Sequence, residues 1–272
     1  MPYNLLQGKK GIIFGALNEQ SIAWKIAEKC HEEGAQIVLT NAPIAMRMGE
    51  INKLAEKCGN APVIAADVTN NEDLKNLLQK SVEHFGGPVD FILHSVGMSM
   101  NMRKNNAYTD LNYDFTHKTM DISALSLHRI LQLAYHMDAI SEWGSVVALT
   151  YIAAQRVFPD YNEMADAKSL LESIVRSFGY QYAIKKKVRI NSVSQSPTRT
   201  TAGSGVKGFE GFITYAEKMS PLGNASAEDC ANYCVTLFSD LCKMVTMQNL
   251  FHDGGFSFTG VSKEVIEQME KQ

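Results

Sequence analysis

The sequence predicts an α/β fold, a single doubly wound domain with about seven parallel strands and helices on both faces of the sheet. Three observations predict it. Short apolar runs alternate with amphipathic helical patterns, and such alternation is typical of parallel strands joined by right-handed crossovers. The strand runs are apolar almost throughout, as expected of strands covered on both faces. The length of 272 residues suits one large domain, and there is no internal repeat or linker.

The elements of this Rossmann-like domain, which spans residues 1–272, follow one another along the chain. Strands are expected at 11–15, 36–40, 62–68, 90–97, 144–150, 188–194 and 247–255. Helices are expected at 21–34, 71–86, 112–137, 161–186 and 226–240. Sheets of this kind bind ligands at the carboxyl ends of their strands, so the residues that follow each strand form the candidate site.

Charge and composition narrow the class of partner. The formal net charge is −3, and the only basic cluster is the lysine run at 185–187, which we interpret as the solvated end of a helix. Nucleic acid is therefore not an expected partner. No apolar run is long enough to span a membrane and the N-terminus has no signal-peptide pattern, so we expect no membrane association and a cytoplasmic location.

The five cysteines do not predict disulfide or metal chemistry. Their number is odd, they form no C-x-x-C pair, and the sequence around them lacks the spacing of a set of cysteine and histidine metal ligands. A disulfide framework and a zinc site are both disfavoured, and we expect no metal.

The end of the first strand is a candidate phosphate site. Gly15 allows a close backbone approach, and the chain then enters a helix at Ser21 and Ile22. The free N–H groups and positive dipole at a helix start suit a pyrophosphate. The turn is longer than G-x-G-x-x-G, and a simple strand-to-helix turn with Ser21 as its N-cap is an equal alternative.

The next two strand ends bear on the identity of a nucleotide. Residues 40–43 contain neither an acid nor an arginine, and the nearest arginine is Arg47. Since a 2′-phosphate is commonly met by an arginine at this turn, the sequence favours NADH over NADPH. Asp67 and Val68 end the third expected strand. The Asp67 carboxylate either accepts a hydrogen bond from an adenine amino group or serves as an acid at the start of the next helix.

The fourth expected strand ends in His94, Ser95, Val96 and Gly97. Gly97 leaves room for a flat cofactor ring beside the backbone, with Val96 next to it. His94 is interpreted as a histidine packed in the core.

Two tyrosines and a lysine follow the fifth expected strand. Tyr151 comes directly after it, Tyr161 ten residues later and Lys168 seven residues after that. Asp160 and Glu163 have the spacing of a capping box, which predicts that Tyr161 begins a helix. Lys168 would then lie on the same helix face within about 20°, roughly 10 Å further along the axis.

This spacing points to carbonyl chemistry at the ligand-binding edge of the sheet. The ammonium of Lys168 is expected to lower the pKa of the Tyr161 phenol and to hold ribose hydroxyls. A tyrosine O–H directed at a substrate carbonyl stabilises negative charge that develops on that oxygen.

These motifs resemble the short-chain dehydrogenase/reductase family, and within it the bacterial enoyl-acyl-carrier-protein reductases. The matching segments are the turn at 15–23, HSVG at 94–97, DIS at 121–123, the block 151–168, RTTAGSGVKGF at 199–209 and HDGGFS at 252–257. A second tyrosine ten residues before the first is specific to this branch. Ala148 stands where most short-chain dehydrogenases carry a serine, thirteen residues before the tyrosine.

The resemblance implies a role for each matching residue. Tyr161 would bind the thioester carbonyl, Lys168 the nicotinamide ribose, and Tyr151 would support the substrate. Ser99 would contact the substrate. Residues expected along the nicotinamide and pyrophosphate are Thr198, Thr200 and Ala202.

The resemblance also implies the reaction and its partners. The expected activity is NADH-dependent reduction of trans-2-enoyl thioesters on acyl-carrier protein, by a homotetramer. Residues 198–219 are expected to form a mobile lid over the acyl chain. Two departures bear on the cofactor contacts: Gln195-Ser196-Pro197 replaces the usual A-G-P, and Ala42 replaces a glutamine common near adenosine.

Two alternatives remain open from the sequence. A ketoacyl or alcohol dehydrogenase of the same fold is disfavoured because Ala148 lacks the hydroxyl used in that chemistry. A regulator that binds NAD(H) without turnover is disfavoured by the intact pair of Tyr161 and Lys168.

Overall fold

The computed structural model describes residues 2–47, 50–201 and 208–271. Its strands form one parallel sheet in the order β2-β1-β3-β4-β5-β6. The strands are β1 (Lys10–Phe14), β2 (Gln36–Thr40), β3 (Val89–His94), β4 (Ile140–Thr150), β5 (Arg189–Gln195) and β6 (Asn249–His252). The predicted doubly wound α/β class is confirmed.

The expectation of a strand at 62–68 is wrong, so the described residues contain six strands rather than seven. This segment makes a single parallel bridge, between Val63 and Leu39. The amide of Ile64 donates to Leu39, and the amide of Ala66 donates to Asn41, which lies past the end of β2. Because β2 stops at Thr40, no further ladder can form there.

Helices connect the strands and cover the sheet. They are α1 (Ile22–Glu32), α2 (Pro43–Met46), α3 (Glu50–Lys57), α4 (Asn71–Phe85), α5 (Met100–Lys104), α6 (Tyr113–Met120), α7 (Ser126–His136), α8 (Glu163–Lys186), α9 (Phe209–Met219), α10 (Ala227–Phe238) and α11 (Lys263–Met269). A π-helical turn, Asp121–Leu125, joins α6 to α7, so the expected helix at 112–137 is nearly continuous.

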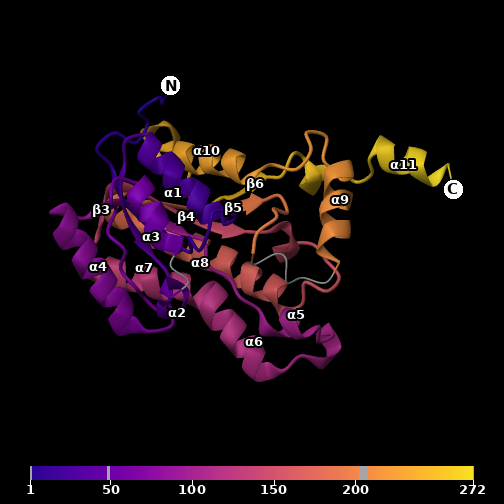
Figure 1. Cartoon of the computed structure of the whole chain (residues 1–272), viewed down its shortest axis with the longest axis horizontal. Helices are drawn as coiled ribbons and strands as arrows, with labels where there is room; N and C mark the ends of the chain where they lie inside the picture. The colour runs from indigo at the N-terminus through magenta and orange to yellow at the C-terminus, as the bar shows by residue number, and fades with distance from the viewer. Residues whose placement is uncertain (1, 48–49, 202–207, 272) are drawn as a thin grey trace.

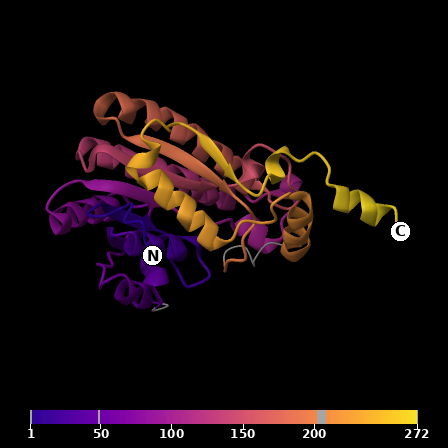
Figure 2. The same cartoon turned by 90° about the horizontal axis from the view of Figure 1, so that it is seen from above.

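Two apolar layers hold the helices against the sheet. Because strand side chains alternate between faces, Ile13 and Leu93 pack toward α1, α3 and α10, whereas Ile12 and Ile92 pack toward α4, α7 and α8. Figure 1 shows α1 and α10 on one side of the sheet and α4 and α7 on the other. Figures 1 and 2 both show α11 standing away from this body, at the C-terminal end of the chain.

The strand order reverses beside β1, because β2 lies on one side of it and β3 on the other. Ligands of doubly wound sheets bind in the crevice at such a reversal. Gly15, directly after β1, has a φ of 95°, and an added Cβ would come within 1.9 Å of the backbone oxygen of Ser95. The two strand ends therefore meet in a contact that only glycine permits.

Within the described residues, no helix is long and apolar enough to cross a membrane, and no cluster of histidine, cysteine or acidic side chains has the arrangement of a metal site. All five cysteines are free thiols and four of them are buried.

Candidate active site

The loop between β1 and α1 is built around the hydroxyl of Ser21. This oxygen accepts hydrogen bonds from the amides of Leu17 and Asn18, both at 3.1 Å, and donates to the carbonyl of Asn18. Ser21 occupies the N-cap position of α1, but its side chain does not cap the helix. Ile22 begins the helix and packs against the core. The first free N–H groups of α1 are thus left for another acceptor, as a phosphate site requires.

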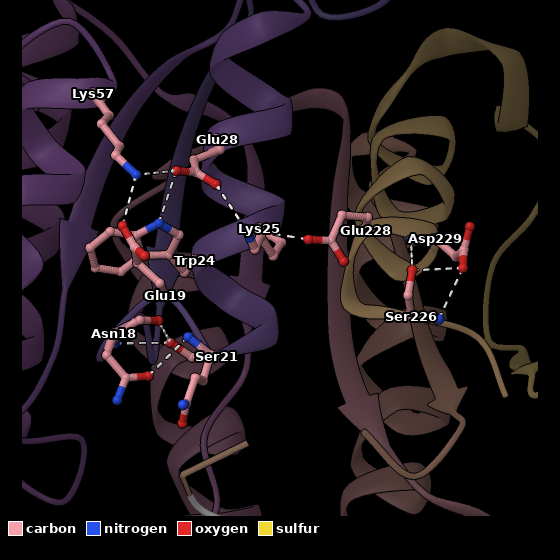
Figure 3. Close-up of polar contacts among 11 residues, drawn as sticks. Asn18, Glu19, Ser21, Trp24, Lys25, Glu28, Lys57, Ser226, Glu228 and Asp229 are labelled. Atoms are coloured by element: carbon pink, nitrogen blue, oxygen red, sulfur yellow. Dashed lines mark hydrogen bonds and ion pairs between the residues drawn. The ribbon is translucent and has the colours of Figure 1, made fainter. Parts of the chain in front are cut away.

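Figure 3 shows that α1 is tied to α10 by exposed charges. Lys25 Nζ lies 3.3 Å from Glu228 Oε1, at the start of α10. Lys57 Nζ lies 3.0 Å from Glu19 and 3.2 Å from Glu28. Exposed pairs of this kind add little stability, but they fix these side chains around the mouth of the β1–α1 loop.

A cavity of about 370 Å³ opens beside this loop. Its walls come from the β1–α1 loop, the segment after β5 and the start of α10, and include Gln20, Thr198, Arg199 and Ser226. The segment after β5, which is expected to run along the pyrophosphate, therefore lies across this cavity from the β1–α1 loop, which is expected to bind it.

The segment after β5 contains the other residues expected along the cofactor. Thr198 Oγ1 donates to the backbone two residues earlier, and Asn18 Nδ2 donates to Thr201 Oγ1 at 2.8 Å, so the segment is joined to the β1–α1 loop. Thr200 lies between them. Ala202 lies outside the described residues, as does the rest of 202–207 in the expected lid.

Asp67 and Val68, which are expected near the adenosine, follow the segment that pairs with the end of β2. One oxygen of Asp67 accepts from both the amide and the hydroxyl of Thr69, at 2.9 and 2.7 Å. Helix α4 begins later and carries its own N-cap, Asn70, so Asp67 is not an acid of that helix start. Val68 is buried in the core. Arg47 is exposed at the end of α2, and no other arginine lies near the turn after β2 in the described residues.

Lys168 is buried at the carboxyl ends of β3 and β4. Its Nζ donates to the carbonyl of Leu149 at 3.0 Å and approaches that of Val96 at 3.5 Å. Burial lowers the pKa of Lys168 to about 8, while the nearby carboxylate of Glu172 opposes that shift. A Cβ added to Gly97 would lie 3.7 Å from this Nζ, so Gly97 keeps the space in front of the ammonium open.

His94 takes no part in this edge of the site. Its Nε2 lies 2.8 Å from Ser126 Oγ, and burial lowers its pKa to about 3, so the ring is neutral. This confirms its interpretation as a core histidine.

The two tyrosines share an aromatic pocket. The ring centroids of Tyr151 and Tyr161 are 5.4 Å apart, and Phe158 and Phe212 complete the wall at 5.3 and 6.0 Å from Tyr151. The buried hydroxyl of Tyr151 has no hydrogen-bond partner, and none is found for the Tyr161 hydroxyl among the described residues. Two phenol O–H groups are thus available to a ligand in one apolar pocket.

The expectation that Lys168 lowers the pKa of Tyr161 is wrong. Burial raises the pKa of the Tyr161 phenol, and burial raises that of Tyr151 as well. Loss of hydration disfavours the phenolate, and Lys168 is not among the causes of the Tyr161 pKa shift. Both tyrosines are therefore neutral hydrogen-bond donors at neutral pH.

The predicted capping box at Asp160 and Glu163 is also wrong. Asp160 and Asn162 have positive φ values of 63° and 47°, so the chain turns sharply on both sides of Tyr161 and α8 begins only at Glu163. Tyr161 thus precedes the helix, and the argument that it shares a helix face with Lys168 does not hold. The carboxylate of Glu163 turns inward instead of capping.

Ser99 is the N-cap of α5 and is almost fully buried. Its hydroxyl accepts from the amide of Met102 and donates to Glu163 Oε1 at 2.7 Å. The proton of the Ser99 hydroxyl is thus used in the hydrogen bond to Glu163 and is not available to a substrate.

The side chains of Gln195 and Ser196 bond to the segment that precedes α10. Gln195 Nε2 donates to the carbonyls of Ala225 and Ser226 at 3.0 and 3.2 Å, and the amide of Ala225 donates to Ser196 Oγ at 3.0 Å. These contacts with residues 225 and 226 accommodate the larger side chains at this point.

Two contributors to the site were missed from sequence. The Glu172 carboxylate accepts hydrogen bonds from Thr150 at 2.9 Å and from Gln155 at 2.9 Å. Its negative charge raises the pKa of Lys168. Its position four residues after the lysine, one helical turn on, was the available signal. Phe212 of α9 had no signal, because only the tertiary fold brings it to Tyr151.

The profile of the enoyl-(acyl carrier protein) reductase family matches residues 15–257. The chain belongs to this family. The FabI–NADH complex of Alistipes finegoldii is 64% identical, covering 96% of this chain and 92% of that one with a TM-score of 0.95.

More distant members of the enoyl reductase family are also similar. The enoyl-[acyl-carrier-protein] reductase [NADH] FabI of Aquifex aeolicus is 34% identical over 260 residues, 94% of each chain. The Bacillus cereus enoyl-acyl carrier protein reductase, solved with NADP+ and an indole naphthyridinone, is 30% identical, covers 96% of this chain and 100% of that one, and has a TM-score of 0.88.

Proposed function

We propose that this protein reduces trans-2-enoyl thioesters carried by acyl-carrier protein, using NADH, as the last step of the type II fatty-acid elongation cycle. The observation that carries the proposal is the pair of neutral phenols, Tyr151 and Tyr161, whose O–H groups have no hydrogen-bond partner among the described residues. They share one apolar pocket that follows β4, and the Leu149 carbonyl of β4 also anchors the Lys168 ammonium. Membership of the enoyl reductase family and the NADH complex of the Alistipes finegoldii relative agree with it.

The residues present fit NADH. The open side of Gly97 leaves space for a flat ring in front of Lys168, and the start of α1 leaves N–H groups for the pyrophosphate. Among the described residues, only one oxygen of Asp67 accepts hydrogen bonds, and the other oxygen suits an adenine amino group. The turn after β2 offers no cation for a 2′-phosphate, which favours NADH over NADPH.

The protein's part in the reaction is electrostatic and geometric. NADH, when bound, supplies the hydride for the β-carbon of the substrate. Tyr161 donates its O–H to the thioester oxygen, where negative charge develops as the enolate forms. Because its phenol stays protonated, this donor is present through the whole range of neutral pH.

Lys168 holds the cofactor rather than activating the tyrosine. Its ammonium, anchored on the Leu149 carbonyl, faces the space beside Gly97 where ribose hydroxyls are expected. Glu172 keeps more of the ammonium charged than burial alone would allow.

The aromatic wall suits an acyl chain. Phe158 and Phe212 pack edge to face at 4.9 Å, and Phe212 belongs to α9, within the expected lid. We propose that α9 closes over the acyl chain and opens to admit it. Ser99 is proposed to line the substrate side through its backbone, since its hydroxyl serves Glu163.

Self-association is part of the proposal. Apolar side chains lie exposed on α8, among them Leu170, Tyr180 and Ile184. We propose that this face is covered in a homotetramer, which sedimentation equilibrium measures directly. The proposed location is the cytoplasm, where acyl-carrier protein would meet the enzyme.

The test is oxidation of NADH by the full-length protein with crotonyl thioester, compared with acetoacetyl thioester and with NADPH. Turnover of the crotonyl substrate with NADH is expected. Reduction of the acetoacetyl substrate alone would instead identify a ketoreductase. Cofactor binding without turnover of either substrate would identify a regulator that senses NAD(H).

A further inference from the structure

The carboxylate of Glu163 is the most deeply buried acid beside the candidate active site. Glu163 is fully buried and lies two residues after Tyr161. Its Oε1 accepts a hydrogen bond from Ser99 Oγ at 2.7 Å and lies 2.8 Å from Thr119 Oγ1, whose single proton is shared between this oxygen and the Phe115 carbonyl at 2.9 Å. Among the described residues, no lysine, arginine or histidine forms an ion pair with it. In the part of the chain that the structure describes, the partners of this buried carboxyl group are thus two hydroxyls.

This arrangement joins three separate elements. Ser99 is the N-cap of α5, Thr119 lies in the last turn of α6, and Glu163 is the first residue of α8. The same three elements supply Met102, Met120 and Met164, whose side chains form a small apolar cluster with Tyr161 packed against it. The carboxylate therefore fixes the three elements that make the wall behind the Tyr161 ring.

The backbone on both sides of Tyr161 needs such support. Asp160 has a φ of 63°, and Asn162 has φ 47° and ψ −142°, a conformation that residues other than glycine rarely adopt. Strained residues persist only where surrounding contacts hold them. Asn162 is held on one side by its own side chain, which donates to the carbonyl of Asn106 at 2.7 Å. Glu163 provides the anchor on the other side.

The second carboxylate oxygen argues against a purely stabilising role. Glu163 Oε2 is buried and has no hydrogen-bond partner. A buried polar atom left unpaired destabilises the folded state, and an apolar side chain of similar shape would avoid that penalty. A buried group that destabilises the folded protein at a functional site is expected to have a role in the function of that site.

We propose that Glu163 is a positioning residue for Tyr161. By clamping Ser99 and Thr119 to the start of α8, it sets the place at which the Tyr161 hydroxyl meets the thioester oxygen. The role of this hydroxyl rests on the proposed function; the clamp itself is a property of the fold.

The test compares substitutions in the full-length protein. In Glu163→Gln the amide oxygen can still accept both hydroxyls, whereas Glu163→Val removes the acceptor and keeps the site filled. Thr119→Val removes one of the two donors. Ser81→Ala, which removes a buried hydroxyl that donates to Leu77 in α4, is the control for loss of an ordinary buried hydrogen bond. The measurements are kcat and KM with crotonyl thioester, NADH affinity by fluorescence, and the urea midpoint.

Glu163→Val is expected to lower kcat by about 10- to 100-fold, the effect of a misplaced catalytic group, with NADH affinity unchanged and a urea midpoint no lower than that of the wild type. Glu163→Gln is expected to retain most of kcat, and Thr119→Val to show a smaller loss than Glu163→Val. Wild-type kcat in Glu163→Val would overturn the proposal. So would equal losses of kcat and stability in Glu163→Val and Glu163→Gln, which would indicate a structural role only.

A crystal structure of Glu163→Val separates this inference from the proposed function. The clamp predicts that residues 160–162 and the Tyr161 ring move by about 1 Å or more. An unmoved Tyr161 would overturn the inference even if the wild type reduces enoyl thioesters. A moved Tyr161 in a protein that reduces no enoyl thioester would uphold the clamp and refute the function.

Discussion

Replacing Lys168 by methionine is predicted to stabilise the cofactor-free protein. Lys168 is only 8% exposed, and burial lowers its pKa from 10.5 to about 8. At about 1.36 kcal/mol for each pH unit between the folded and unfolded pKa values, the buried ammonium costs roughly 3 kcal/mol at neutral pH. Its hydrogen bond to Leu149 is worth roughly 1 kcal/mol. Lys168→Met should therefore gain about 2 kcal/mol while losing cofactor binding and turnover.

The sign of the pH dependence follows from the lowered pKa. Below about pH 8 the lysine is charged in both the folded and the unfolded chain, so the full penalty is present. Between the folded pKa and the unfolded pKa the folded protein binds fewer protons, and the wild type gains stability as the pH rises. The advantage of Lys168→Met should thus be largest near pH 7 and shrink toward about pH 10.

The assay is urea unfolding of the two proteins without cofactor at both pH values. Lys75→Met, at an exposed position of α4, is the matched control and should change stability little at either pH. A Lys168→Met protein that is less stable than the wild type near neutral pH would refute the reasoning. A gain that is the same at both pH values would also refute it, because the gain would then not come from the charge.

Four further outcomes are expected from the same geometry. Turnover should decline above about pH 8, as Lys168 loses its proton, in a pH profile of kcat/KM. Glu172→Gln should move that decline to lower pH, since the Glu172 carboxylate favours the ammonium; an unmoved profile would contradict this. Tyr151→Phe should lower kcat less than about 100-fold and raise the urea midpoint slightly, because it removes a buried hydroxyl without a partner. Gly15→Ala should prevent folding to the native state, measured by circular dichroism, because its Cβ would meet the Ser95 oxygen at 1.9 Å.

The fold was largely predictable because the periodicity of the sequence reflects burial. Strands covered on both faces give continuous apolar runs, and these located all six strands of the described sheet. The segment at 62–68 has the same composition but lies beside the end of β2, and strand length at an edge depends on the partner rather than on composition. The sequence of one segment does not show how far its neighbouring strand extends, so it does not predict where pairing stops.

The active-site region was predicted less completely than the fold. The prediction that Tyr151 and Lys168 lie at the carboxyl ends of the strands agrees with the structure, because Tyr151 directly follows β4 and Lys168 bonds to Leu149 of β4. The Asp-x-x-Glu spacing at 160–163 misled because positive φ values at Asp160 and Asn162 exclude a regular helix start there. Those values are imposed by tertiary contacts, so local sequence rules do not reveal them.

The central claim is that the Tyr161 hydroxyl stabilises the oxyanion formed when NADH reduces an enoyl thioester. The most direct measurement is kcat for crotonyl thioester in the wild type and in Tyr161→Phe, with NADH affinity measured on both proteins. The account predicts a loss of about 10²- to 10³-fold in kcat with NADH affinity unchanged, the usual effect of removing one oxyanion donor. A Tyr161→Phe protein that turns over at the wild-type rate would contradict it.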